Sequence, residues 1–182
     1  SAVGAALTLD ALPLLDLPVE NAALALQAFA LLEPARPLEP AARVLAETRL
    51  AGRLDRHHVL FQGRRLTLLL DVGHNPQASE FLAARLRQRP CAGRRLAVFG
   101  LLADKDLEGV LQPLLGMIDS WLVAPLPNGR TRPALELQQA LEAAGARSAQ
   151  ADSVATALDR QCGLASEQDE ILVFGSFYCV AE

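Results

Sequence analysis

Beyond about residue 50, short runs of consecutive apolar residues alternate with longer segments whose apolar residues recur every three or four positions. An uninterrupted apolar run is typical of a strand that is covered on both faces of a sheet. The recurring spacing is that of one face of a helix. The pattern predicts strands over residues 53–61, 66–72, 96–101, 121–124 and 171–174, and helices over residues 77–89, 106–115, 133–144 and 153–162.

This alternation predicts an α/β fold with a Rossmann-like, doubly wound and mostly parallel sheet, because a helix between two strands returns the chain for parallel pairing. The first two strands are the exception. Only a short turn at Gln62-Gly63-Arg64 separates them, so the first strand must run antiparallel and is expected at an edge of the sheet.

Residues 1–50 differ from the rest, because they are rich in Ala and Leu and lack alternating strands. Residues 21–32 are apolar all round, which predicts a buried helix. Pro40 suits the first turn of a second helix that extends to about Leu50. We interpret residues 1–50 as the tail of a preceding domain with a linker, and residues 51–182 as the α/β domain. Since the chain starts without Met and stops directly after an apolar segment, we expect it to be cut from a longer protein.

Composition excludes several classes of partner. The net charge is −4 and no basic stretch is longer than two residues, which argues against nucleic-acid binding. No apolar run reaches membrane-spanning length or resembles a signal peptide. Cys91, Cys162 and Cys179 lie far apart, so we expect neither a metal site nor a disulfide framework. These features predict a cytoplasmic protein without a membrane partner.

The carboxyl ends of the parallel strands are the expected ligand edge of such a sheet. Asp71 ends a buried strand, where a carboxylate needs a partner or a ligand. Gly73 permits a close approach of the backbone, and His74 is expected to project into the same crevice. Asn75 and Pro76 are fully explained as the cap and first residue of a helix.

Two further strand ends carry candidate ligand groups. Lys105, the single lysine of the chain, lies in an Asp-Lys-Asp sequence that is either a solvated loop or the site of one ammonium able to hold a carboxylate. Gly175-Ser176 follows the last strand and is either a tight turn or a carboxylate site. The chain contains no GxxxxGK[ST], GxGxxG or GxSxG sequence. The residues alone therefore indicate a Rossmann-like domain with a crevice for a small ligand.

Four sequence blocks resemble those of the folylpolyglutamate synthase / dihydrofolate synthase family of the Mur ligase superfamily. The sequence Asp71-Val72-Gly73-His74-Asn75-Pro76 resembles the family's D-x-A-H-N-P signature. The other three blocks, which occur in the family's order, are Gly52-Arg53-Leu54, residues 98–106 and residues 171–181. The resemblance covers roughly residues 18–182 and implies a carboxy-terminal Mur ligase-type domain.

The resemblance implies an ATP-dependent ligase that adds L-glutamate to dihydropteroate and to folates. In this family ATP phosphorylates a carboxylate, and the amine of glutamate attacks the acyl phosphate. ATP and Mg²⁺ would be held mostly by an amino-terminal ATP-binding domain, of which residues 1–50 would be the helical tail. We expect this chain alone to be inactive, and the protein to be a monomer.

The resemblance also assigns roles to individual residues. Arg53 and Asp71 would bind the ribose of ATP and nearby groups, and His74 and Asn75 would line the cleft near the nucleotide, with His74 as the catalytic candidate. Lys105 would bind a carboxylate of the incoming glutamate, assisted by Ser176. We expect that Asp71→Ala would weaken ATP use and leave the domain folded.

Three departures from the family's pattern carry expectations of their own. Gly73 replaces the usual Ala and is expected to loosen its loop. The segment from Arg53 to Asp71 is a few residues longer than the family's pattern, and the final helix is truncated, which would expose an apolar face of the last strand.

Two other classes of function compete with the ligase. A stand-alone, non-catalytic α/β module could bind a nucleotide or a small carboxylic acid, but it has no need of the helical residues 1–50. The missing glycine fingerprint argues against an oxidoreductase domain.

Overall fold

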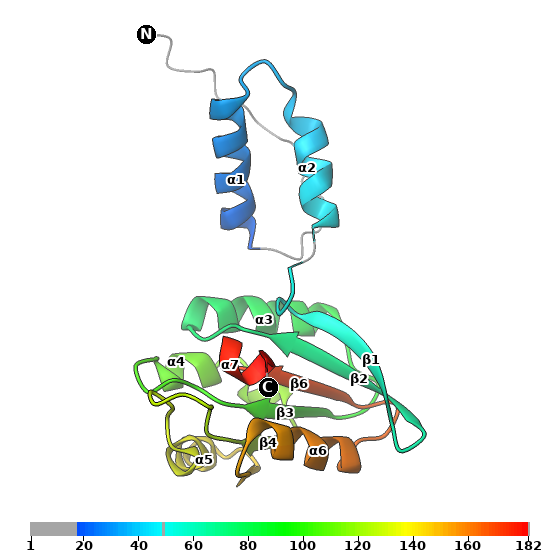
Figure 1. The fold of residues 1–182 in the computed structure, drawn as a ribbon, viewed down its shortest axis with the longest axis vertical. Helices are drawn as coiled ribbons and strands as arrows, with labels where there is room; N and C mark the ends of the chain where they lie inside the picture. Colours follow the sequence, from blue (N-terminus) through cyan, green and yellow to red (C-terminus); the bar gives the residue numbers. More distant parts are fainter. Residues whose placement is uncertain (1–17, 49, 182) are drawn as a thin grey trace. The chain divides into compact units, whose positions relative to one another are not determined.

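The computed structural model describes residues 18–48 and 50–181 (Figure 1). The chain divides into two compact units, the first ending at Leu50 and the second beginning at Ala51. Within the two described ranges, none of the helices combines the length and the apolar character that crossing a membrane requires.

The first unit contains two helices that pack against each other, α1 (Val19–Leu32) and α2 (Leu38–Glu47). The prediction that residues 21–32 form a buried helix is wrong for this unit. Only Ala22 and Leu26 of α1 are buried, whereas Leu31 and Leu32 are more than 80% exposed. The physical reason is that α2 covers a single stripe of α1 among the described residues of this unit, so the remaining apolar side chains have no cover there.

The second unit confirms the predicted α/β class. Its six-stranded sheet is parallel except for one pair, because β1 runs antiparallel to β2 at an edge, as predicted. The strand order is β1-β2-β6-β3-β4-β5, with β1 at Asp55–Phe61, β2 at Arg64–Asp71, β3 at Arg95–Phe99, β4 at Ser120–Val123, β5 at Ser148–Gln150 and β6 at Glu170–Phe174.

The predicted turn between the first two strands is a two-residue hairpin. Gln62 and Gly63 both have positive φ angles, 49° and 79°. This backbone conformation matches the twist of the two strands, which explains how so short a connection reverses the chain.

Helices cover both faces of the sheet, as a doubly wound fold requires (Figure 1). One core contains side chains of α3 (Pro76–Gln88), α4 (Leu107–Leu111) and α5 (Ala134–Ala143), and the other contains side chains of α6 (Val154–Leu164) and α7 (Phe177–Ala181). The central strand β6 contributes alternate residues to the two cores. All five of its residues are buried, so the expected exposure of the last strand is wrong.

Two elements differ from the sequence prediction. The helix predicted over residues 106–115 ends at Leu111, because Pro113 has no N–H to continue the hydrogen-bond ladder. A short 3₁₀ turn, η1 (Leu115–Met117), follows it. The three-residue β5 was not predicted, since it carries no apolar run of strand length.

The strand order places three strand ends at one level. Asp71 of β2 and Phe99 of β3 are both register partners of Phe174 in β6. The chain leaves β2 and β3 toward helices of one face and leaves β6 toward α7 on the other. Such a change of direction between neighbouring strands opens a crevice at their carboxyl ends.

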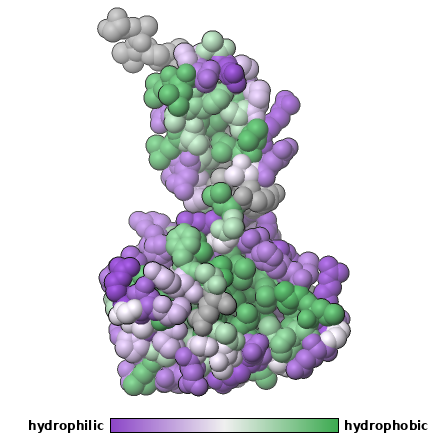
Figure 2. All heavy atoms as spheres, viewed as in Figure 1, coloured by the Kyte–Doolittle hydropathy of each residue, from purple (hydrophilic) through white to green (hydrophobic). Residues whose placement is uncertain are grey.

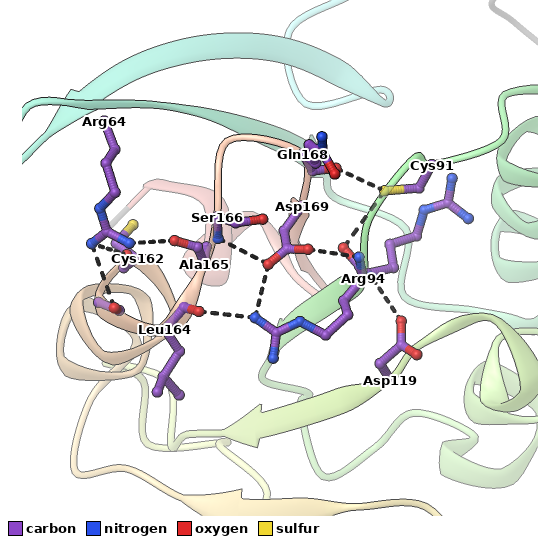
Figure 3. A network of polar contacts seen from close by, with 12 residues as sticks. Arg64, Cys91, Arg94, Asp119, Cys162, Leu164, Ala165, Ser166, Gln168 and Asp169 are labelled. Carbon is purple, nitrogen blue, oxygen red and sulfur yellow. Dashed lines mark hydrogen bonds and ion pairs between the residues drawn. The ribbon is translucent and has the colours of Figure 1, made fainter.

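Polar groups at the amino ends of the strands are occupied by structural bonds (Figure 3). The carboxylate of Asp169 accepts hydrogen bonds from the backbone and guanidinium of Arg94, at 2.7 and 2.8 Å, and from the N–H of Ser166 at 2.9 Å. Arg64 donates to the carbonyl oxygens of Cys162 and Ala165, at the end of α6. These bonds join the loops at the amino ends of the strands, opposite the carboxyl ends where a ligand is expected.

Candidate functional site

Asp71 ends β2 with its carboxylate turned back onto the backbone. One oxygen accepts from the N–H of Gly73 at 2.7 Å, and the other accepts from the N–H of Leu54 at 2.9 Å. Burial raises the pKa of Asp71, while these two bonds and the charge of Arg53 act in the opposite direction. The partner that a buried strand-end carboxylate requires is therefore the protein's own backbone.

Asp71 and its neighbour fix the segment that precedes β1. The N–H of Val72 donates to the carbonyl of Gly52 at 2.7 Å, next to the bond from Leu54 to Asp71. Exposed Arg53 lies between these two anchored residues. The sequence prediction that brought Arg53 and Asp71 to one place thus agrees with the geometry, although their ligand roles stay predictions.

This geometry changes two expectations. Gly73 does not loosen its loop, because its N–H is held by Asp71 and a Cβ there would lie 2.7 Å from the Asp71 carboxylate. We now expect Asp71→Ala to lower the stability of the domain as well as to weaken ATP use, because it would leave the N–H groups of Gly73 and Leu54 without their acceptor.

His74 and Asn75 lie on the turn between β2 and α3. The Nδ1 of His74 lies 2.9 Å from the carbonyl oxygen of Val72, and since a carbonyl only accepts, Nδ1 carries the hydrogen. In the neutral ring the half-buried side chain then presents Nε2 as an acceptor. Asn75 caps α3 by accepting from Ala78 at 2.9 Å, which confirms the predicted cap and leaves its amide group as a donor.

Lys105 lies on the loop between β3 and α4. Its ammonium group is 3.0 Å from the carboxylate of Asp104, and 29% of its side chain is exposed. The hydrogen bond from Lys105 lowers the pKa of the exposed Asp104. Asp106 caps α4 by accepting from Gly109 at 3.0 Å, so the cap predicted for this loop is confirmed.

Ser176 follows β6 and is buried. Its hydroxyl accepts from the N–H of Tyr178 at 3.2 Å, which favours the tight-turn interpretation without excluding a ligand. Gly175 has a φ of 111° and passes close to the carbonyl of Gly100 at the end of β3. The ends of β6 and β3 are thus in direct contact.

Sequence reasoning missed Arg132, which lies between β4 and α5. Its guanidinium donates to the carbonyls of Ala103 and Lys105, both at 2.7 Å, and pairs with Glu136. No local pattern marks such a residue, because the two carbonyls lie 29 and 27 positions away along the chain.

The predicted site residues therefore lie at the carboxyl ends of three neighbouring strands. Arg53, Asp71, His74 and Asn75 surround the end of β2, Ser176 follows β6, and Lys105 follows β3. Across residues 18–48 and 50–181, no group of three His, Cys, Asp or Glu side chains is arranged to hold a metal ion.

A family model described as "Mur ligase, glutamate ligase domain" matches residues 52–177. The chain belongs to this family. The match begins beside Arg53 and ends just after Ser176, so it includes every strand of the second unit and all six candidate residues.

Bacterial relatives carry a more specific name. The dihydrofolate synthase/folylpolyglutamate synthase of Escherichia coli (strain K12) is 38% identical over 96% of this chain and 39% of its own length. The protein of the same name from Haemophilus influenzae is 34% identical over 96% of this chain and 43% of its own length. The chain thus spans about two fifths of the length of these relatives.

Solved structures give the same picture for the fold. E. coli FolC in complex with DHPP and ADP has a TM-score of 0.76 at 38% identity, over 95% of this chain and 40% of its own. A bifunctional folylpolyglutamate synthase/dihydrofolate synthase with Mn, AMPPNP and L-glutamate bound has a TM-score of 0.77 at 36% identity, with the same coverage. These relatives share the α/β architecture of this family member.

Proposed function

We propose that this chain serves as the glutamate ligase domain of an ATP-dependent folylpolyglutamate synthase / dihydrofolate synthase. The position of Lys105 carries the proposal. Its ammonium group is a cation at the expected ligand edge of the sheet, and the matching family model is described as a glutamate ligase domain. A relative with L-glutamate and an ATP analogue bound supports the choice of substrates.

In the proposed reaction, ATP transfers its γ-phosphoryl group to a carboxylate of dihydropteroate or of a folate, and ADP leaves. The amine of glutamate then attacks the acyl phosphate, an amide bond forms, and phosphate departs with a proton lost from the amine. Positioning contributes much of the rate in such a reaction. In our proposal Lys105 holds a carboxylate of glutamate, and Ser176 assists at the end of β6.

The groups around β2 fit a nucleotide. Arg53 supplies an exposed cation, His74 supplies an acceptor at Nε2, and Asn75 supplies an amide donor. Asp71 accepts one backbone hydrogen bond on each oxygen and retains acceptor capacity for a ribose hydroxyl, although it is only 5% exposed. We propose that His74 lies close to the reacting phosphate.

In the proposed enzyme, Mg²⁺ and the triphosphate of ATP are held mostly by an amino-terminal ATP-binding domain. We assign residues 1–50 to the tail of that domain and to the linker. Carboxylates and phosphate oxygens are the ligands that Mg²⁺ prefers.

The test is a product assay on a polypeptide that joins this chain to such an ATP-binding domain. With ATP, Mg²⁺, L-glutamate and either dihydropteroate or a folate, mass spectrometry should detect a product heavier by one glutamyl residue, formed together with ADP. The chain alone should give no product. Nucleotide binding without any ligation product would instead favour a non-catalytic binding module.

A further inference from the structure

The loop that carries Lys105 is joined to the loop after β4 by backbone and side-chain hydrogen bonds. The backbone N–H of Ala103 donates to the carbonyl of Arg130 at 2.8 Å, and the backbone N–H of Arg132 donates to the carbonyl of Leu101 at 2.9 Å. In addition, the carbonyls of Ala103 and Lys105 both accept from one terminal nitrogen of the Arg132 guanidinium. A single side chain therefore bridges two carbonyls of the loop that carries Lys105.

Arg132 is itself held in place. Its side chain is only 12% exposed, and its other terminal nitrogen pairs with Glu136 on the first turn of α5. Its Nε is buried and finds no hydrogen-bond acceptor among residues 18–48 and 50–181.

The charges near Arg132 argue against a second anion site. A groove of about 630 Å³ lies beside it, and Lys105, Asp106, Glu108, Arg132 and Glu136 contribute its charged lining. With three carboxylates and two cations, this lining has no excess positive charge to hold a second anion beside Arg132. Arg132 is also committed to protein partners at both terminal nitrogens.

We propose that Arg132 is a positioning residue for Lys105, acting from the loop after β4 on the loop after β3. By fixing the carbonyl of Lys105, it sets the direction in which the ammonium group leaves the loop. This inference rests on the proposed function, since it assumes that Lys105 contacts glutamate.

The experiment compares steady-state kinetics of Arg132→Met in the full-length enzyme with those of the parent, well below the melting temperature of both. The KM for glutamate should rise by between about tenfold and a hundredfold, because small displacements of a positioning group have effects of this size. The KM for ATP should stay close to that of the parent. Arg132→Lys, which retains a donor, should recover part of the loss.

Arg147→Met provides a matched control. It removes the same charge from an exposed position just before β5, at the other end of the strands, and should leave the KM for glutamate unchanged. An Arg132→Met enzyme with the parent's KM for glutamate would overturn the inference, as would equal increases in the KM for glutamate and for ATP.

A double-mutant cycle separates this inference from the function on which it rests. Lys105→Ala should raise the KM for glutamate, and Arg132→Met should add little in that background, because both changes remove the same interaction. If Lys105→Ala has no effect, the proposed role of Lys105 fails. If Lys105→Ala has its effect and the Arg132 change is fully additive to it, only the positioning role fails.

Discussion

The carboxylate of Asp71 joins two segments that are distant in the sequence. It accepts from the N–H of Gly73, on the turn after β2, and from the N–H of Leu54, which precedes β1 and lies 17 positions away. Each oxygen is thus used by the fold, and the ligand role that we propose for Asp71 draws on the same two atoms. A substitution at this residue therefore affects stability as well as any bound nucleotide.

We predict that Asp71→Asn lowers the free energy of unfolding by about 1–3 kcal/mol, because the amide NH₂ must face a backbone N–H in a buried place. Chemical denaturation checks this value. Asp152→Asn, at an exposed position, should change stability by less than about 0.5 kcal/mol. Equal stability of the two variants would contradict the anchoring role of Asp71.

Asp169 predicts a dependence of stability on pH. Although burial alone would raise its pKa, the hydrogen bonds from Arg94 and Ser166 lower the pKa of Asp169 from 3.8 to about 2. A depressed folded-state pKa means that the contribution is complete above the unfolded-state value and is lost as pH falls from 3.8 through about 2. The shift corresponds to about 2 kcal/mol.

Urea unfolding at several pH values tests this prediction. The parent should lose more stability than Asp169→Asn between pH ~5 and pH ~2, by most of that ~2 kcal/mol. Parallel pH profiles for the two proteins would show that the Asp169 bonds do not contribute as described.

Only part of the role of Asp71 could be predicted from the sequence. Its place at the end of a buried strand predicts a need for partners, and the structure supplies two backbone N–H groups. The bond to Leu54 was beyond prediction, since no pattern in the sequence connects the two residues. Arg132 was missed for the same reason, because the carbonyls that it bridges are close to it only in the folded chain.

At the scale of elements, the alternating pattern predicted the main strands and most helices, because each presents a continuous run or a repeated face. It did not predict β5, which has three residues and no buried side chain to form a run. It also overestimated the helix after Asp106, which ends before Pro113. Short elements are fixed by their neighbours in space, and a local pattern does not contain that information.

The contact between the ends of β6 and β3 gives a prediction for Gly175. A Cβ there would clash with the carbonyl of Gly100 and lie 2.7 Å from the ring of Phe99, and the φ of 111° disfavours any L side chain. Gly175→Ala should therefore destabilise the fold by about 2–5 kcal/mol in thermal or chemical unfolding.

Gly163, within α6, is the matched control. Open space surrounds its Cβ position, so Gly163→Ala should be neutral or should stabilise by up to about 1 kcal/mol. Similar effects at the two glycines would contradict the close approach of β6 to β3.

At the scale of the molecule, the hydrophobic pattern predicted the fold class, the antiparallel edge and the sheet edge that carries the candidate site. It did not predict that β6 lies between β2 and β3, because the order of strands depends on long crossovers that leave no local trace. This order brings Ser176 between the ends that carry Asp71 and Lys105. Figure 2 shows apolar side chains on the viewed surfaces of both units.

The proposed ligand site is tested most directly by a crystal structure, with a non-hydrolysable ATP analogue and L-glutamate, of a polypeptide that joins this chain to an ATP-binding domain. We expect the nucleotide at Arg53, Asp71 and His74, and a carboxylate of glutamate roughly 3 Å from the ammonium group of Lys105. Ligands bound at the amino ends of the strands, or a glutamate that makes no contact with the loops after β3 and β6, would contradict it.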